Sequence, residues 1–260
     1  MRGASETAGA LRTWSRNGEL VAVGLLDGPD GLLRLALDPA LRRDEQSARH
    51  IAADIADPAR GVLPAGEAVV EARGAESLHD VLLAAGWEHD EPWIPLRRDL
   101  AEPVLNTLVT RGHLRVDTVN SDRADAWMEV HWSAFKGTRF GAEDRRKVVE
   151  LWSTMMSGPF AERGRSVSII DPAGRMVAVV GVWSAGRGRP GLIEPMGVHR
   201  DCRGQGYGVV ACEAAASILR EMGSSSAIVC AESSNIAAVA TYSAAGFTAH
   251  PAVPDLVRPS

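Results

Sequence analysis

The stretch Arg203-Gly204-Gln205-Gly206-Tyr207-Gly208 decides how the rest of the chain is interpreted. It stands between the apolar run 191–198, which predicts a strand, and the run 209–222, which predicts an amphipathic helix ending at Gly223. Glycine has no Cβ atom, so the backbone amides of such a loop can approach a ligand closely. Because amides at the start of a helix attract anions, the stretch predicts a phosphate or pyrophosphate site.

This glycine motif alone is compatible with more than one kind of loop. A glycine-rich helix start without a ligand is the plainest alternative, because short glycine motifs recur by chance. A Walker loop would need a Lys-Ser/Thr pair after the glycines, where this chain has Val209-Val210. A dinucleotide-binding fold would place the motif early in its sheet, whereas little sequence follows it here.

A second motif further along favours a ligand. The run 227–231 predicts a short buried strand, and 235–247 predicts a helix that Gly246 ends. Asn235 and Tyr242 are seven residues apart, so a helix would bring them onto one face, two turns apart.

Together and in this order, the two motifs resemble the GNAT superfamily of acyl-CoA-dependent N-acyltransferases. The resemblance is tight over roughly 55 residues and loose over 114–247. It implies an α/β (α+β) fold with a mixed central sheet flanked by helices, and acetyl-CoA as co-substrate without a metal. The cofactor-binding positions that it implies are Met196, Gly197, Val198, Arg203, Gly204, Gln205, Gly206, Tyr207, Gly208 and Asn235.

Two residues are the candidates for catalysis. Glu194 lies four residues before Val198 on the same strand face, where it would take the proton of an acceptor amine. Pro195 cannot donate a ladder hydrogen bond, so the strand is expected to bulge or splay there. Through the resemblance, Tyr242 would be the acid for the departing thiolate. The plainer alternatives are a surface carboxylate and a packing tyrosine.

The acceptor side is predicted less sharply. In the resembled family, the segment between the first two helices of the domain lines the acceptor pocket. Predicted helices at about 122–135 and 142–156 leave 135–141 as that segment. Phe135, Arg139 and Phe140 are therefore the candidate substrate-binding residues, and a solvated loop is the alternative.

An internal repeat organises the whole chain. Gly86 and Gly246 are 160 residues apart, and Leu37 and Val198 are 161 apart, because the strand–helix–strand–helix pattern of 32–87 recurs in 192–247. This predicts two GNAT-like domains: a truncated, degenerate domain over residues 1–102 and a catalytic domain over 103–260. The layout looks most like the tandem-domain group that includes mycothiol synthase. Residues 42–47, which replace the glycine stretch, carry two carboxylates, so no CoA is expected there.

Bulk properties limit the function classes. The net charge is −5 without a basic stripe, which argues against a nucleic-acid partner. No apolar run approaches the ~20 residues of a membrane span. Three cysteines without a C-x-x-C pair favour a reducing, cytoplasmic location. His79, His89 and Asp90 form no metal-binding pattern.

We therefore expect an N-acetyltransferase that moves an acetyl group from acetyl-CoA to a primary amine by direct attack, with a small molecule as acceptor. The alternative is an acyl-CoA-binding sensor or scaffold without turnover. A protein amine as acceptor, a longer acyl chain and the oligomeric state stay open.

Overall fold

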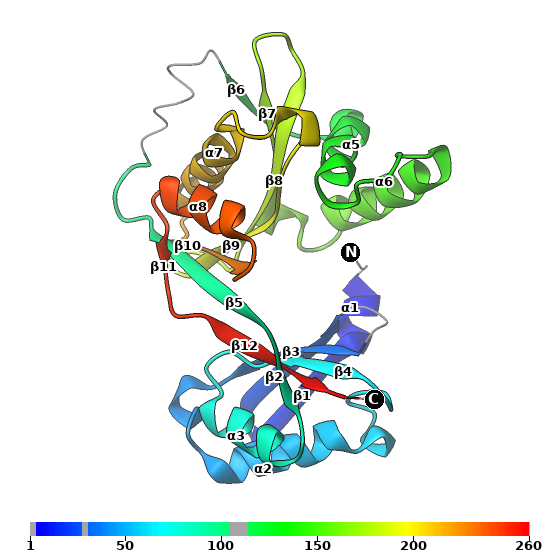
Figure 1. The fold of residues 1–260 in the computed structure, drawn as a ribbon, viewed down its shortest axis with the longest axis vertical. Helices are drawn as coiled ribbons and strands as arrows, with labels where there is room; N and C mark the ends of the chain where they lie inside the picture. Colours follow the sequence, from blue (N-terminus) through cyan, green and yellow to red (C-terminus); the bar gives the residue numbers. More distant parts are fainter. Residues whose placement is uncertain (1–3, 28–30, 105–113, 260) are drawn as a thin grey trace. The chain divides into compact units, whose positions relative to one another are not determined.

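The structure, a computed structural model, describes residues 4–27, 31–104 and 114–259. The chain divides into two compact units (Figure 1). The N-terminal unit consists of Ala4–Trp93 and Ala252–Ser260, and the C-terminal unit contains Ile94–Pro251. We describe each unit separately.

The C-terminal unit is built on a mixed sheet with the order β6-β7-β8-β9-β10-β5, and β11 pairs with β5. The strands β6 to β9 are antiparallel neighbours, whereas β9 and β10 run parallel. The strand bounds are β5 (Glu88–Asp99), β6 (Arg115–Thr118), β7 (Gly164–Ile170), β8 (Met176–Ser184), β9 (Pro190–Val198), β10 (Ser226–Glu232) and β11 (Thr248–Ala249).

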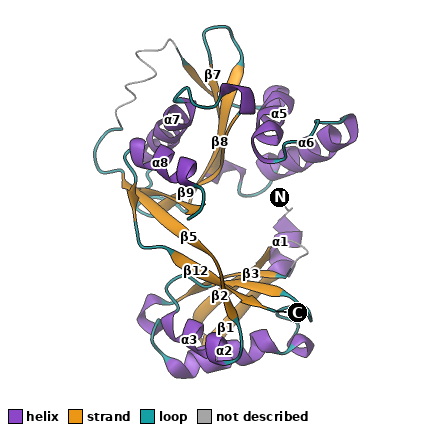
Figure 2. Ribbon diagram, in the orientation of Figure 1, coloured by secondary structure: helices purple, strands orange, loops and turns teal. Residues whose placement is uncertain are grey.

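Helices flank this sheet on both sides, as the sequence predicted (Figure 2). The pair α5 and α6 lies on one side, and α7 and α8 lie on the other (Figure 1). At Gly191 an added Cβ would stand 2.4 Å from Leu219 Cδ2 of α7, so this glycine lets the helix rest directly on the sheet. The helix bounds are α5 (Ala124–Phe135), α6 (Ala142–Ser157), α7 (Tyr207–Glu221) and α8 (Ile236–Ala244).

The N-terminal unit is a smaller version of the same plan. Its sheet has the order β1-β2-β3-β4-β12-β5, with α2 and α3 together on one side (Figure 1). The largest fully buried side chains of this unit are Leu33, Ile51, Ile55, Leu78, Leu82 and Leu256. The bounds are α1 (Ala4–Ala10), β1 (Leu11–Arg16), β2 (Glu19–Asp27), β3 (Leu32–Leu37), α2 (Glu45–Ala56), β4 (Ala68–Glu71), α3 (Glu76–Ala84) and β12 (Val253–Arg258).

The hairpin β1–β2 was not predicted from the sequence, although a signal for it exists. Asn17 and Gly18, with φ of 54° and 82°, form the tight turn between the strands. An Asn-Gly pair between two apolar runs is the strongest local signal for such a hairpin. In the described part of this unit the helix α1 precedes the hairpin, whereas β6, α5 and α6 precede β7 in the C-terminal unit.

The helices α3 and α8 end in the same hydrogen-bond pattern, 160 residues apart in the sequence. At the end of α3, Gly86 N donates to Leu83 O and Trp87 N to Leu82 O. At the end of α8, Gly246 N donates to Ser243 O and Phe247 N to Tyr242 O, which is the same pattern 160 residues later. Both helices thus end in the glycine-capped turn that is common at helix C-termini, at the spacing of the predicted repeat.

The N-terminal unit is not one continuous stretch of the chain, because it includes residues that follow the C-terminal unit in the sequence. The first half of β5 pairs with β12 through Trp93 and Val253, and its second half pairs with β11 through Leu96 and Ala249. The last strand of the chain thus completes the N-terminal sheet. The boundary near Glu102, which concerns the two sequence copies, stays a prediction.

Candidate active site

The parallel strands β9 and β10 pair over only part of their length. Their register joins Pro190 to Ser226 and ends with Leu192 opposite Ile228. Yet β9 continues to Val198 and β10 continues to Glu232. The strands therefore separate beyond Leu192 and leave backbone groups of both unpaired with each other, which is the splay expected near Pro195.

A bulge of β9 lies at the start of this opening. On β8, Val182 pairs with Ile193 and Val180 pairs with Met196, so the single Gly181 faces two residues of β9. A Cβ on Gly181 would stand 2.5 Å from the Glu194 carbonyl oxygen, so only glycine fits there. The bulge takes Glu194 out of the regular ladder and leaves its side chain exposed.

The predicted anion site lies at the start of α7. Gly204 and Gly206 have φ of 74° and 82°, a region that favours glycine, and an added Cβ would meet no atom within 4 Å. Gly206 is the N-cap of α7 and supplies no side-chain hydrogen bond to the first turn. Amides at this helix end are therefore available to an anion.

Gly208 allows two helices to pack closely, whereas the sequence had explained it by close approach of a ligand. A Cβ there would stand 2.9 Å from Thr241 Cγ2 of α8, so this glycine lets α7 and α8 pack together. Beside it, Met196, Val198 and Tyr207 are partly buried against the core under α7.

Two arginines beside the glycine loop donate hydrogen bonds to carbonyl oxygens at the end of α5 and just after it. The Arg203 guanidinium donates through Nη2 to Ala134 O at 2.8 Å. Arg200 donates to Gly137 O at 3.0 Å and to Ser133 O at 3.2 Å. Cations at a helix C-terminus satisfy its free carbonyl groups. The predicted contact of Arg203 with a cofactor stays a prediction, as does that of the exposed Gln205.

Tyr242 lies in α8 with only 6% of its surface exposed, and its ring meets Phe247 edge-on. Burial raises the pKa of its hydroxyl, and the neighbouring Cys212, Glu194 and Cys230 raise it further. The phenol therefore keeps its proton at neutral pH, as an acid must. The influence of Glu194 on this pKa shows that the two predicted catalytic residues lie near each other.

Asn235 serves the start of α8. It is the N-cap residue, and its side-chain oxygen accepts a hydrogen bond from Ala238 N at 3.1 Å. It therefore precedes the helix, whereas its spacing from Tyr242 predicted a position within the first turn. Its amide group stays exposed at the end of β10.

The three predicted substrate-binding residues have different surroundings. Phe140 stacks on Trp132 at 5.0 Å and lies under the Arg145 guanidinium at 4.6 Å, so it holds its own loop together. Arg139 is exposed. Phe135 is 53% exposed and lies against β9, because a Cβ on Gly197 would be 3.0 Å from its ring.

His131, which the sequence patterns did not single out, stands one turn before Phe135 on the same face of α5. Its ring stacks on Trp127 at 5.6 Å and meets Phe135 at 4.8 Å. Burial lowers the pKa of His131 to about 4, helped by Lys136, so the imidazole is neutral at physiological pH. Its buried Nδ1 has no hydrogen-bond partner in the described structure. The sequence signal that could have identified His131 is its spacing of four residues from Trp127 and from Phe135, which puts the three rings on one face of a helix.

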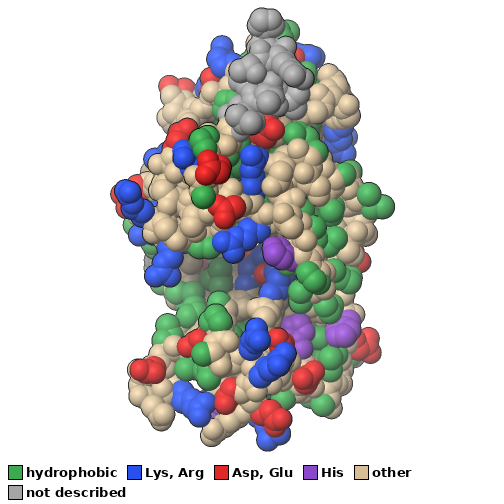
Figure 3. Space-filling model, turned by 90° about the vertical axis from the view of Figure 1, so that its left-hand side faces the viewer, with side chains coloured by type: hydrophobic (Ala, Val, Ile, Leu, Met, Phe, Trp, Pro, Cys, Tyr) green, Lys and Arg blue, Asp and Glu red, His purple; other side chains and the backbone are tan. Residues whose placement is uncertain are grey.

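The part of the chain that the structure describes holds no candidate metal centre. There, no group of three or more His, Cys, Asp and Glu side chains could hold a metal ion. No described helix combines the length and apolar character that crossing a membrane requires. On the face drawn in Figure 3, basic and acidic side chains are interspersed.

Comparison with known proteins relates this region to a family model. Residues 124–247 match the family model described as acetyltransferase (GNAT) family. None of the curated proteins matches the sequence.

The fold has relatives among solved structures. A tandem GNAT protein from the clavulanic acid biosynthesis pathway aligns with a TM-score of 0.67 and 19% identity, over 96% of this chain and 85% of that one. A GCN5-related N-acetyltransferase from Sphaerobacter thermophilus gives 0.64 and 17%, over 93% and 78% of the two chains. One from Kribbella flavida gives 0.59 and 17%, over 98% and 92%.

At these identities the structures show a shared fold alone. The family match covers the strands and helices that surround the opening of β9 and the start of α7. Residues 124–247 of this chain thus match the acetyltransferase (GNAT) family in sequence.

Proposed function

We propose that the C-terminal unit transfers the acetyl group of acetyl-CoA to the primary amine of a small molecule. The observation that carries this proposal is the separation of β9 from β10 beside an α7 that begins at an uncapped glycine. The separated strands offer unpaired backbone groups to an extended arm, and the helix start offers amides to a phosphate.

The residues present fit acetyl-CoA. The amides of the stretch 203–208 would hold its pyrophosphate, since no side chain lies where the glycine Cβ atoms would be at Gly204 and Gly206. Met196, Gly197 and Val198 would pair with its pantetheine arm, and Asn235 lies at the end of the other strand. When bound, acetyl-CoA supplies a thioester whose acetyl group an amine can attack.

Two side chains would move the protons. Glu194 is exposed at the bulge and would remove a proton from the acceptor ammonium, so that the nitrogen lone pair can attack. Tyr242 would give its proton to the sulfur that leaves as the new C–N bond forms. The raised pKa of Tyr242 keeps the phenol protonated at neutral pH, so a proton is present when the sulfur leaves.

We infer that the N-terminal copy binds no cofactor and that the chain resembles the tandem group that includes mycothiol synthase. Its helix α2 begins at Asp44, whose own carboxylate accepts a hydrogen bond from Ser47 N at 2.8 Å. Among the described residues Cys202, Cys212 and Cys230 form no disulfide, which supports a reducing compartment such as the cytoplasm.

Thioester consumption tests this function. The full chain is mixed with acetyl-CoA and each member of a broad amine panel, and release of free CoA thiol is followed. Saturable, amine-dependent release supports an acetyltransferase. Calorimetric binding of acetyl-CoA without release for any amine would favour the sensor or scaffold alternative, and absence of binding would contradict both.

A further inference from the structure

Four strands of the C-terminal unit place one residue each in a row across the sheet. Gly164 of β7 pairs with Trp183 of β8, Trp183 pairs with Leu192 of β9, and Leu192 pairs with Ile228 of β10. Directly opposed residues point to the same face of a sheet. We name Trp183, Leu192 and Ile228 the apolar row.

The row points away from α7. The neighbouring Gly191 faces Leu219 of α7, and successive residues of a strand alternate between faces, so Leu192 points to the other side. On that side α5 contacts β9 at Gly197, where an added Cβ would meet Ala134 at 2.7 Å. The apolar row therefore lies on the face of the sheet that α5 contacts, at the end of β9 opposite to this contact.

The Trp183 indole is held in one orientation. Its ring rests on Gly164, where an added Cβ would be only 2.6 Å away. Its Nε1 donates to the Glu194 carbonyl oxygen at 3.2 Å and so satisfies the carbonyl that the bulge removes from the ladder. A rigid, oriented indole beside the bulge can present its other face to a ligand.

The row is partly exposed. Ile228 is 37% exposed, and Trp183 and Leu192 are partly exposed. Within the described residues, none of the three belongs to a core cluster. Among those residues the indole also has no aromatic or cationic partner.

We propose that the apolar row binds the body of the acceptor and that Glu194 binds its ammonium group, so that the substrate is an amine with an apolar or aromatic body. This rests on the proposed function and names its substrate class. The exposed carboxylate of Glu194 follows Leu192 by two residues along β9, so charge and apolar surface are adjacent. A cation can also lie against the face of an indole.

Binding tests the inference without requiring turnover. The full chain with CoA is titrated with 2-phenylethylamine, ethanolamine and 2-phenylethanol, and the indole N–H signals of its 7 tryptophans are followed by NMR. Trp183→Phe identifies the signal of Trp183. We expect this signal to shift with 2-phenylethylamine at concentrations ~10-fold lower than with either of the other two, because only that probe has both features.

Variants locate the binding surface. Ile228→Ser and Gly164→Ala should each weaken 2-phenylethylamine binding at least ~5-fold, the first by removing apolar surface and the second by displacing the indole. The control is Leu20→Ser, which also replaces an exposed aliphatic side chain by serine, but in β2 of the N-terminal unit. It should leave 2-phenylethylamine binding unchanged.

The possible results separate the binding role of the apolar row from the proposed function. Equal responses to the three probes, no response, or variants that lower thermal stability while leaving the preference intact would overturn the inference. Selective binding without thioester consumption for any amine would uphold the apolar row and contradict the proposed function. Turnover of polar amines as efficient as that of apolar ones would do the reverse.

Discussion

Both units contain a parallel strand pair, but the pairs differ where a ligand would enter. In the C-terminal unit β9 and β10 pair no further than Leu192 and Ile228. In the N-terminal unit β3 and β4 stay paired through Arg34 and Glu71. Arg34 stands 160 residues before Glu194, the spacing that also separates Gly86 from Gly246. By that spacing Arg34 corresponds to the predicted base, and we call the β3–β4 pair closed because it is still paired at this position.

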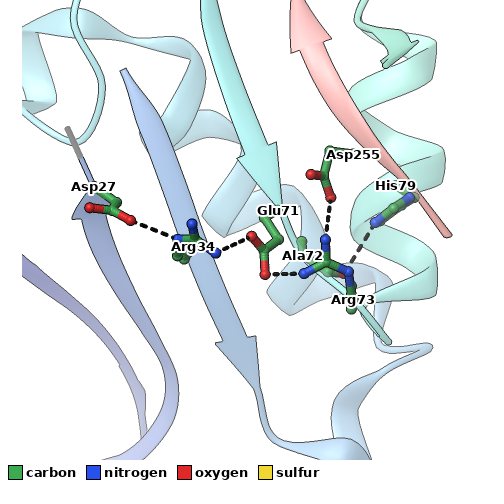
Figure 4. A network of polar contacts seen from close by, with 7 residues as sticks. All are labelled: Asp27, Arg34, Glu71, Ala72, Arg73, His79 and Asp255. Atoms are coloured by element: carbon green, nitrogen blue, oxygen red, sulfur yellow. Dashed lines mark hydrogen bonds and ion pairs between the residues drawn. The ribbon is translucent and has the colours of Figure 1, made fainter. Parts of the chain in front are cut away.

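A network of ion pairs holds that closed pair together (Figure 4). Arg34 donates to Asp27 at 2.9 Å and to Glu71 at 2.8 Å. Arg73 pairs with Glu71 and reaches Asp255 of β12 at 3.3 Å. The charges that could meet a ligand are thus already matched within the unit.

The helices that follow β9 and β3, which are α7 and α2, also differ in the residue at which they begin. Helix α7 begins at Gly206, which offers its first turn no side chain, whereas α2 begins at Asp44. Hydrogen bonds from Ser47 hold the pKa of the Asp44 carboxyl below its usual value, and Arg16 lowers it further. A helix start binds an external anion only when the protein has not supplied one itself. The same plan is therefore compatible with a binding site in one unit and a closed structure in the other.

The largest effect is expected at the start of α7. Gly206→Asp should abolish acetyl-CoA binding, because it places a carboxylate where the pyrophosphate is expected and strains a φ of 82°. Calorimetry with acetyl-CoA measures it. Gly206→Asn, which tolerates this φ without the charge, should retain part of the affinity.

The counterpart change in the other unit sharpens this prediction. Asp44→Gly should create no second site and should cost only a few tenths of a kcal/mol in stability. Two binding sites per wild-type chain, or undiminished affinity in Gly206→Asp, would contradict the distinction between the two helix starts.

The next effect concerns the two residues that stand 160 positions apart. Glu194→Gln should lower turnover ~10²- to 10⁴-fold, the usual contribution of a general base, with little change in acetyl-CoA affinity. Arg34→Gln should leave turnover unchanged. Steady-state rates with an accepted amine and parallel calorimetry measure both. Near-full activity of Glu194→Gln at neutral pH would place the base elsewhere.

A smaller loss is expected at the acid. Tyr242→Phe should keep acetyl-CoA affinity, since the buried ring survives, and lower turnover by about 10- to 100-fold. The loss should shrink at low pH, where solvent protonates the leaving sulfur more easily. Leu82→Ala, at the matching position, should instead cost about 2–5 kcal/mol of stability. Unchanged turnover in Tyr242→Phe would remove the acid role.

The smallest effect concerns pH and the closed unit. Burial raises the pKa of Asp255 to about 6, although Arg73 acts in the opposite direction. Since the folded pKa lies above the unfolded one, the stabilising contribution is complete below about pH 4 and is lost as pH rises through 6. The free energy of unfolding should therefore fall by on the order of 2–3 kcal/mol across this range.

Asp255→Asn should remove this pH dependence, as denaturant unfolding at several pH values between 4 and 8 can show. If the wild type is instead more stable than the Asn variant at pH 8, the pair with Arg73 dominates and Asp255 is ionised at lower pH than stated.

Much of the local structure of both units was predictable from the sequence. The sequence located α7 to within two residues at its start, found the strand of β4 and the turn after β7, and predicted a break near Pro195. These features depend on local chemistry: glycine tolerates positive φ, proline interrupts a ladder, and apolar spacing follows the helix period. The equal spacing that predicts a repeat was likewise visible, and the duplication itself stays a prediction.

Pairings between distant segments were not predictable in this way. Nothing in the residues 253–258 alone indicates that β12 joins β4, which lies far earlier in the chain. The indole of Trp183 reaches the Glu194 carbonyl only because a bulge frees that carbonyl and Gly164 leaves space for the ring.

The sequence by itself determined where glycines or carboxylates stand at a helix start, because these residues act through the local backbone. That only the C-terminal copy binds an anion stays a prediction. Only the tertiary structure decided which face of the sheet is open, which strand ends each sheet, and that Glu194 lies close enough to Tyr242 to influence its pKa. These depend on strand register and on packing between segments that are distant in sequence, which no local pattern encodes.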